Sequence, residues 1–361
     1  MTPLHELLSR KTALSVCLAL FSVLCLSASA SAGPSTIIFD VPGAAPPGTI
    51  AVSSTPAGTT DGYYFDANGT AHGFLLSSTG TFTTFDAPAD NQGTFTLAFG
   101  INPAGAIAGF YFDSNGVGHG YIRHPDGAIS SIDAPGAVAT FAANINPGGE
   151  IAGDYTDMNG VQHAYVRDPS GKITTFSASI AGTAAGQGTF TGFVDCINPS
   201  GAMTGYILDE NKVYHGYVRT SDGEITTFDH SGAGTGPFQG TISTGIGPSG
   251  TVTGYYFDAN NLGHGFVRAA NGAMVNVDIP GAANGTFPAV INARGDIVGQ
   301  YVDANGVGHG FLRSHSGNIV TFDVPAGGGS STSPNGLSSN GEITGNEADS
   351  AGVNHGFVLR F

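Results

Sequence analysis

Histidine recurs along this chain at a spacing that could support chemistry. Seven histidines begin a His-Gly or His-Ala pair every 44 to 52 residues: His72, His119, His163, His215, His264, His309 and His355. In five repeats an aspartate follows one predicted strand later: Asp86, Asp133, Asp229, Asp278 and Asp323. Equivalent positions of successive repeats lie too far apart for a shared metal ring. We therefore expect each pair to form a buried, structural His–Asp hydrogen bond within its own repeat.

An Asp-x-Asn motif precedes six of these histidines. Its members are Asp66, Asn68, Asp113, Asn115, Asp157, Asn159, Asp209, Asn211, Asp258, Asn260, Asp303 and Asn305. Closely spaced carboxylate and amide oxygens are ligands that calcium prefers, and they make this set the candidate binding surface. Each motif, however, offers one acid and lacks the distal bidentate glutamate of an EF-hand loop. The favoured interpretation is a tight turn, in which Asp and Asn accept local backbone hydrogen bonds, and calcium is the alternative.

Sequence signatures of enzymes are sparse. We find no G-x-S-x-G, H-E-x-x-H or P-loop motif, and no Cys–His pairing at metal-ligand spacing. Three histidines outside the repeat register, His124, His230 and His315, are weak catalytic candidates. The longest connections between repeats, residues 177–192 and 230–240, mark the place to look for one asymmetric pocket. The alternative is that these loops merely differ in length.

The elements that position these residues are short strands. One unit, Thr94–Pro135, predicts strands over 94–101, 106–112, 119–123 and 128–133, separated by Asn-Pro-Ala-Gly, Asp-Ser-Asn-Gly and Pro-Asp-Gly turns. Turn residues of this kind between β-branched and aromatic runs are the strongest short-range hairpin signal. Four antiparallel strands every 44 to 52 residues match the dimensions of a propeller blade.

The two ends of the repeat region are complementary. Residues 35–42 match the fourth strands of other repeats, whereas residues 355–361 are a third strand that no fourth strand follows. An N-terminal strand that completes the last blade would hide two sheet edges at once. We predict an all-β, seven-bladed β-propeller of four-stranded blades over residues 33–361, closed in this way.

The repeat resembles the HAF-type extracellular repeat family. The resemblance covers nearly all of residues 35–361 and rests on the recurring D-x-N-G-x-x-H-G-[FY]-x-R and F-D-x-P-G patterns. Ala164, Ser177 and Ala351 depart from them. The resemblance implies a secreted protein and carries no catalytic chemistry to this chain.

Five arginines end predicted third strands near the opposite rim: Arg123, Arg167, Arg219, Arg268 and Arg313. We expect each stem to lie along apolar surface while the head pairs with a carboxylate. An anion-binding surface is the alternative.

The N-terminus and the composition indicate location and exclude some partners. Arg10 and Lys11, an apolar run and the small residues before Ala32 predict a signal peptide over 1–32, hence a secreted or periplasmic protein. Cleavage would leave Cys196 as the sole cysteine, so no intrachain disulfide is expected. A net charge of −16 disfavours nucleic acid. We expect no membrane span and a monomer.

Three classes of function remain open. Near-regular repetition favours a non-catalytic binding module, with the acidic loop rim presenting repeated sites to a glycan or a cell-surface protein. An extracellular polysaccharide hydrolase or lyase with one asymmetric site is the first alternative. A purely structural cell-surface protein is the second.

Overall fold

The computed structural model describes residues 35–87, 95–192, 194–324 and 331–361, which contain strands and the turns and loops between them, with no helix. Contacts group Thr36–Arg360 into one compact unit. The predicted signal peptide, residues 1–32, lies outside the described residues. In the described part no helix is long and apolar enough to span a bilayer.

Consecutive strands pair antiparallel in groups of four. The first groups are β2 (Thr49–Ser54), β3 (Thr60–Phe65), β4 (Ala71–Leu76), β5 (Phe82–Phe85); β6 (Thr96–Ile101), β7 (Ile107–Phe112), β8 (Gly118–Arg123), β9 (Ile129–Ile132); and β10 (Ala137–Ile145), β11 (Ile151–Asp157), β12 (Gln162–Arg167), β13 (Ile173–Phe176). The strands predicted in the unit Thr94–Pro135 correspond to β6–β9, with ends that differ by at most two residues.

The same pattern of antiparallel groups continues to the end of the chain. The groups are β14 (Gly188–Thr191), β15 (Met203–Leu208), β16 (Tyr214–Arg219), β17 (Ile225–Phe228); β18 (Gly240–Ile246), β19 (Val252–Phe257), β20 (Gly263–Arg268), β21 (Met274–Val277); β22 (Thr286–Ile291), β23 (Ile297–Val302), β24 (Gly308–Arg313), β25 (Ile319–Phe322); and β26 (Ser331–Leu337), β27 (Ile343–Ala348), β28 (Asn354–Arg360). Strand β1 (Ser35–Phe39) pairs with β28 and so supplies the fourth strand of the last group.

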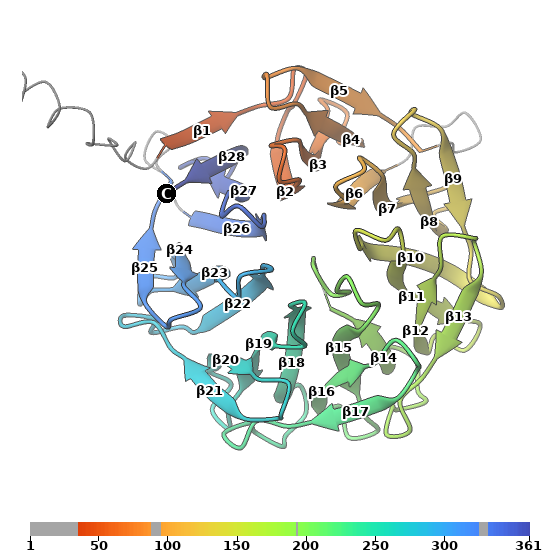
Figure 1. Ribbon diagram of the computed structural model, residues 1–361, viewed down its shortest axis with the longest axis vertical. Helices are drawn as coiled ribbons and strands as arrows, with labels where there is room; N and C mark the ends of the chain where they lie inside the picture. Colours follow the sequence, from red (N-terminus) through yellow and green to blue (C-terminus); the bar gives the residue numbers. More distant parts are fainter. Residues whose placement is uncertain (1–34, 88–94, 193, 325–330) are drawn as a thin grey trace, which may run out of the picture. The chain divides into compact units, whose positions relative to one another are not determined.

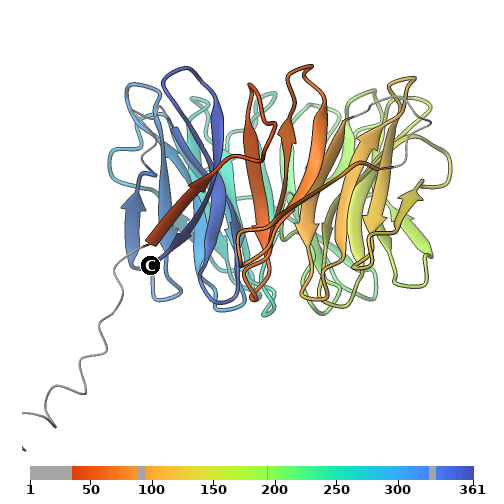
Figure 2. The same ribbon diagram turned by 90° about the horizontal axis from the view of Figure 1, so that it is seen from above.

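The groups are arranged around a common centre. Strands β2, β6, β10, β18, β22 and β26 lie nearest to it, and β5, β9, β13, β17, β21 and β25 lie at the periphery (Figure 1). Seen from the side, the strands run between two rims of turns (Figure 2). The first and last groups contact each other: Asn335 Nδ2 donates to Ala51 O over 2.9 Å, and Thr344 Oγ1 to Val52 O over 3.2 Å.

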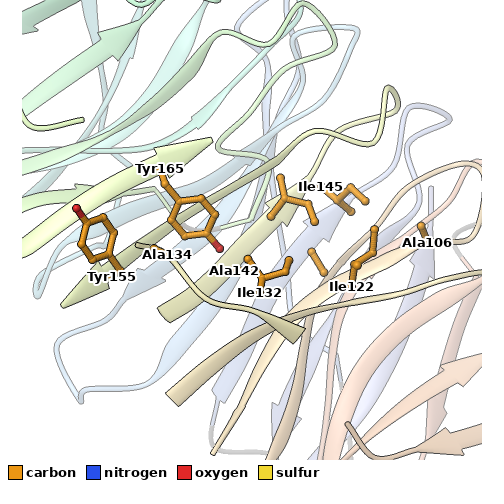
Figure 3. Close-up of a cluster of buried hydrophobic side chains, with 10 residues drawn as sticks. Ala106, Ile122, Ile132, Ala134, Ala142, Ile145, Tyr155 and Tyr165 are labelled. Carbon is orange, nitrogen blue, oxygen red and sulfur yellow. The ribbon is translucent and has the colours of Figure 1, made fainter. Parts of the chain in front are cut away.

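The hydrophobic core lies between neighbouring sheets. One cluster joins Ile122 and Ile132 of the β6–β9 group to Ile145 and Tyr165 of the next group (Figure 3). Each strand alternates between faces that pack on the preceding and on the following sheet, so both faces of an inner strand are apolar. Strand β18 is buried over all its residues, whereas β6, β22 and β26 alternate between buried and half-buried positions.

A buried threonine at the start of each innermost strand fixes the connection from the preceding strand. Its Oγ1 accepts a hydrogen bond from a backbone N–H just after the fourth strand, at 2.9 to 3.2 Å. The threonines are Thr49, Thr96, Thr140, Thr189, Thr241, Thr286 and Thr332, all at most 3% exposed. The contact recurs in every group although 6 to 11 residues separate its two partners, so one polar contact joins each pair of successive sheets.

Candidate functional site

The Asp-x-Asn motifs form turns between the second and third strands. Asp66 Oδ1 accepts hydrogen bonds from Asn68 N and Thr70 N, at 2.8 and 2.9 Å, and Oδ2 accepts one from Asn68 Nδ2 at 3.1 Å. The N–H groups of Thr70 and Asn68 hold the pKa of Asp66 below its ordinary value. Equivalent bonds form at Asp113, Asp157, Asp209, Asp258 and Asp303 with Asn115, Asn159, Asn211, Asn260 and Asn305. These carboxylates serve their own turns, as the favoured interpretation requires.

The turns also explain why glycine usually ends the motif. Gly69 and Gly306 have φ of +78° and +80°. Lys212 and Asn261 occupy the same position in their repeats and take φ of +64° and +62°. Because a side chain disfavours this region, those two turns store a small strain.

Six of the seven repeat histidines lie between two carboxylates. His72 Nδ1 is 2.7 Å from Asp86 Oδ1, and its Nε2 is 3.7 Å from Asp66 Oδ2. His119, His215, His264 and His309 make the same contacts with Asp133, Asp229, Asp278 and Asp323. Turn and fourth-strand end therefore meet on one rim.

Two repeats vary this arrangement. His163 bonds Ser177 Oγ at 2.7 Å, because serine replaces the aspartate there. His355 bonds Asp40 Oδ1 at 2.9 Å, and Asp40 follows β1. The histidine of the last group thus bonds an aspartate that follows the first strand of the sequence.

The expectation that these pairs are buried is wrong. The fourth-strand aspartate side chains are 45 to 64% exposed, because they lie at the strand end, where the rim meets solvent. In five repeats a tyrosine that the sequence interpretation missed covers the histidine ring, as Tyr111 does on His119 with centroids 5.2 Å apart. The signal for it is the recurrent Tyr of the second strand.

The fourth-strand aspartates leave carboxylate oxygens exposed on this rim. The second oxygen of Asp86, Asp133 and Asp323 accepts no hydrogen bond from the described part of the chain. The Asp229 carboxylate raises the pKa of His215 by accepting its hydrogen bond. Within the described ranges, no group of three or more His, Cys, Asp or Glu side chains could hold a metal ion.

The structure does not bring the off-register histidines together. His124 begins the turn after β8, His230 follows β17, and His315 lies in the turn after β24, so they belong to different groups. His230 is buried, stacks on Tyr256 at 4.0 Å and accepts a hydrogen bond from Gly232 N, and burial lowers its pKa. His315 is 70% exposed. No shared catalytic geometry follows from these positions.

A glutamine side chain braces each of the two long connections. Gln187 braces residues 177–192 by donating to Glu210 O and accepting from Ala184 N. Gln239 does the same in 230–240, through Ala259 O and Gly236 N. The loops are therefore similar to each other, and neither lines the cavities at the centre of the ring.

Among the described residues, no carboxylate forms the ion pair that we expected for the repeat arginines. Arg123, Arg219 and Arg268 lie 4.6 to 4.9 Å over the rings of Phe85, Phe176 and Phe228 in the preceding group. Their Nη1 atoms lie 3.2 to 3.4 Å from the next residue's carbonyl oxygen, which closes the turn. These guanidinium groups thus join neighbouring sheets through cation–π contact.

A feature that sequence reasoning missed lies at the centre. Six innermost strands, β2, β6, β10, β18, β22 and β26, each carry a β-bulge at the same offset. The residues left out of the register are Val52, Phe99, Ala143, Thr244, Ala289 and Asn335. A bulge redirects a side chain, and all of these but Ala143 line a central cavity. No sequence signal marks a bulge of this kind.

This axial cavity measures about 520 Å³. Its apolar wall comprises Ile50, Val52, Tyr63, Phe99, Val194, Tyr255, Phe287, Pro288, Ala289, Val290 and Pro334. Its polar arc comprises Thr244, Gln300, Ser333, Asn335 and Asn346. Tyr63, Tyr255, Gln300 and Asn346 occupy one equivalent position of the second strand, so the groups differ from one another here.

A second, narrow cavity of about 190 Å³ is lined by the turns between first and second strands. Asp195 lines it, with φ of +58°, and burial raises its pKa to about 7. Burial also raises the pKa of Asp61 to about 7, although Ser53 N and Oγ donate to its Oδ1. Sequence reasoning missed both acids, which replace the apolar or small residues of other repeats.

No protein-family model matches the chain, and no curated protein matches it. Among solved structures, it is similar to virginiamycin B lyase from Staphylococcus aureus, with a TM-score of 0.59 and 14% identity over 91% of this chain and 99% of that one. A streptogramin B lyase structure matches with the same TM-score and identity, over 91% and 97%. A lectin from Burkholderia pseudomallei matches with a TM-score of 0.54 and 13% identity, over 91% and 96%. At this identity the likeness shows the fold alone, which is all-β and β-propeller-like.

Proposed function

We propose that the chain is a closed, seven-bladed β-propeller. The narrow cavity supports this, because it is lined by turns from all groups, including Ser53, Asn102, Asn146, Asn198, Pro248, Asn292 and Ser338. Asparagine side chains bridge successive turns there: Asn146 Nδ2 donates to Asn198 O, and Asn198 Nδ2 to Gly247 O. The pairing of β1 with β28 and the bonds from Asn335 and Thr344 to β2 support closure.

As its function, we propose non-catalytic binding of hydroxyl-rich ligands, of the glycan class, through the acidic rim. One observation carries this proposal: a half-exposed aspartate, oriented by a histidine, recurs around the rim with an oxygen open to a hydroxyl donor, as in Asp86, Asp133 and Asp323. Equivalent shallow sites on one rigid face gain avidity from repetition. A secreted location and membership of the HAF-type repeat family are parts of the same proposal, and they rest on residues 1–32 and on the repeat motifs.

In this proposal the turn aspartates hold the conformation of their own turns and do not form a metal site. Their oxygens already accept backbone and amide hydrogen bonds, as at Asp66. A calcium ion would have to displace these bonds or find its ligands elsewhere. Calcium dependence therefore remains the alternative that the experiment resolves.

The test is glycan-array binding by the full chain, first in calcium and then in EDTA. We expect binding in both conditions, with apparent affinity falling stepwise as Asp86→Asn, Asp133→Asn and Asp323→Asn are combined. The control is Asp222→Asn, which changes the same charge in a turn after β16, on the other rim. Binding lost in EDTA would assign calcium to the turns. Absence of any retained glycan would refute the glycan proposal, and release of new reducing ends would favour the hydrolase alternative.

A further inference from the structure

We propose that the axial cavity binds one small, uncharged molecule that has a largely apolar ring and at least one hydrogen-bond donor. This site is separate from the rim and takes a different class of ligand. The rim repeats one set of residues, whereas the cavity presents a single asymmetric surface at the centre of the ring.

The walls favour a flat apolar body. Tyr63 and Phe99 stack with centroids 6.1 Å apart and planes at 23°, and Tyr255 meets Phe287 edge to face at 5.2 Å. Aliphatic side chains such as Val290 complete the wall. Aromatic rings prefer offset or edge contacts with a further ring, so these faces suit a cyclic ligand.

The polar arc favours a ligand that donates hydrogen bonds. Asn335 Nδ2 donates to Ala51 O and to Asn346 Oδ1, both at 2.9 Å. Gln300 Nε2 donates to Thr332 O at 3.1 Å and contacts the hydroxyls of Ser331 and Ser333 at 3.0 Å. Both amide NH2 groups are therefore used within the protein. The amide oxygens of Asn335 and Gln300, two residues that line the cavity, accept no hydrogen bond from the described residues, so both are available to a donor on the ligand.

Charge and size limit the ligand further. No Asp, Glu, Lys, Arg or His is among the described residues that line the axial cavity, so an ionised ligand would lose its hydration without a partner. A volume of about 520 Å³ lies within the range of small-molecule sites.

The construction of the wall supports a binding role. The same bulge, at the same offset, delivers Val52, Phe99, Thr244, Ala289 and Asn335 to the cavity. The fold requires the β-bulge in the backbone, but it does not require the side chains at the bulges to differ from one group to the next. At positions where the repeat serves folding, such as the rim histidines and the buried threonines, one residue type recurs. The bulge residues that line the cavity are instead five different residue types, so the surface that a ligand would touch varies around the centre.

The test uses three naphthalene probes with the full chain, followed by probe fluorescence. We expect saturable, one-to-one binding of 2-naphthol, which is neutral and donates one hydrogen bond. Binding of 2-methoxynaphthalene, which lacks the donor, should be about tenfold weaker. The anion 2-naphthoate should show no saturable binding.

A cavity-filling variant locates the site. Ala289→Phe introduces at one bulge the residue that Phe99 already provides at another, so the fold should tolerate it, and 2-naphthol binding should be lost. Ala304→Phe makes the same change in an exposed turn of the same group and should leave binding unchanged. If Ala289→Phe lowers the melting temperature, Ala289→Leu replaces it, and at least about a threefold weakening is expected.

Three results would overturn the inference. These are no saturable binding of 2-naphthol, equal affinity for 2-naphthol and its methyl ether, and full affinity in the Ala289 variants. Each is independent of glycan binding at the rim, which the array measures separately.

Discussion

Replacement of Thr140 by valine tests whether the buried threonines hold successive sheets together. Thr140 is 1% exposed, and its Oγ1 accepts a hydrogen bond from Ala134 N over 3.0 Å. Valine keeps the shape but leaves the N–H of Ala134, itself 4% exposed, without that acceptor. A buried donor left unpaired costs about 1 to 3 kcal/mol. For a chain of this size each 1 kcal/mol lowers the melting temperature by about 2 to 4 °C, so we expect a decrease of about 2 to 12 °C.

The assay is unfolding in guanidinium and by heat, followed by circular dichroism at a fixed protein concentration. The control, Thr83→Val, makes the same change at an exposed position of β5, where the effect should stay within about 0.5 kcal/mol. If Thr140→Val is no more destabilising than Thr83→Val, the threonine bond does not set the stability of the sheet connection. A matching loss at any other threonine of the set would extend the conclusion to the whole ring.

Two further predictions concern the rim. The folded-state pKa of His215 is raised by Asp229, so this pair stabilises the fold fully below the ordinary histidine pKa, and its contribution is lost as pH rises through the folded-state value. Asp229→Asn should therefore lower the melting temperature more at pH 5.5 than at pH 8.5, whereas Asp126→Asn should show no such trend; parallel melting curves across pH would contradict this. Gly306→Ala should destabilise by about 1 kcal/mol, because φ is +80° and a Cβ would meet nothing within 4 Å, so that only backbone strain acts. Lys212→Gly should stabilise by a similar amount, because it relieves φ of +64°, and equal melting temperatures for both variants and the parent chain would refute the strain argument.

The turns and strand pairs within one repeat could be predicted from the sequence, for definite physical reasons. Asp113-Ser114-Asn115-Gly116 predicts its turn because Asp and Asn bond the nearby backbone and Gly116 takes φ of +78°. The pairing of His119 with Asp133 followed from their repeated offset, although its exposure did not. Exposure depends on where the strand ends relative to the rim, and a repeat pattern does not encode that position.

The candidate sites were accessible only in part. The rim residues recur in register and could be predicted, whereas the axial cavity depends on bulges that leave no mark in residue type. Phe99 and Ala289 look like ordinary strand residues until the register shows that each is skipped. The arginine contacts were missed for a related reason: Arg123 meets Phe85 of another repeat, and partners across repeats cannot be paired from one sequence.

The bulges have a consequence for altering this protein. Because each skipped residue stands outside the strand pairing, its side chain can be exchanged without changing any ladder hydrogen bond on either side. Val52, Phe99 and Ala289 are therefore the positions to vary, whereas Thr244 and Asn335 are kept because they donate hydrogen bonds to Pro288 O and Ala51 O of neighbouring groups. A library that varies only these positions would sample many cavity surfaces, while the two rims and the strands between them stay the same.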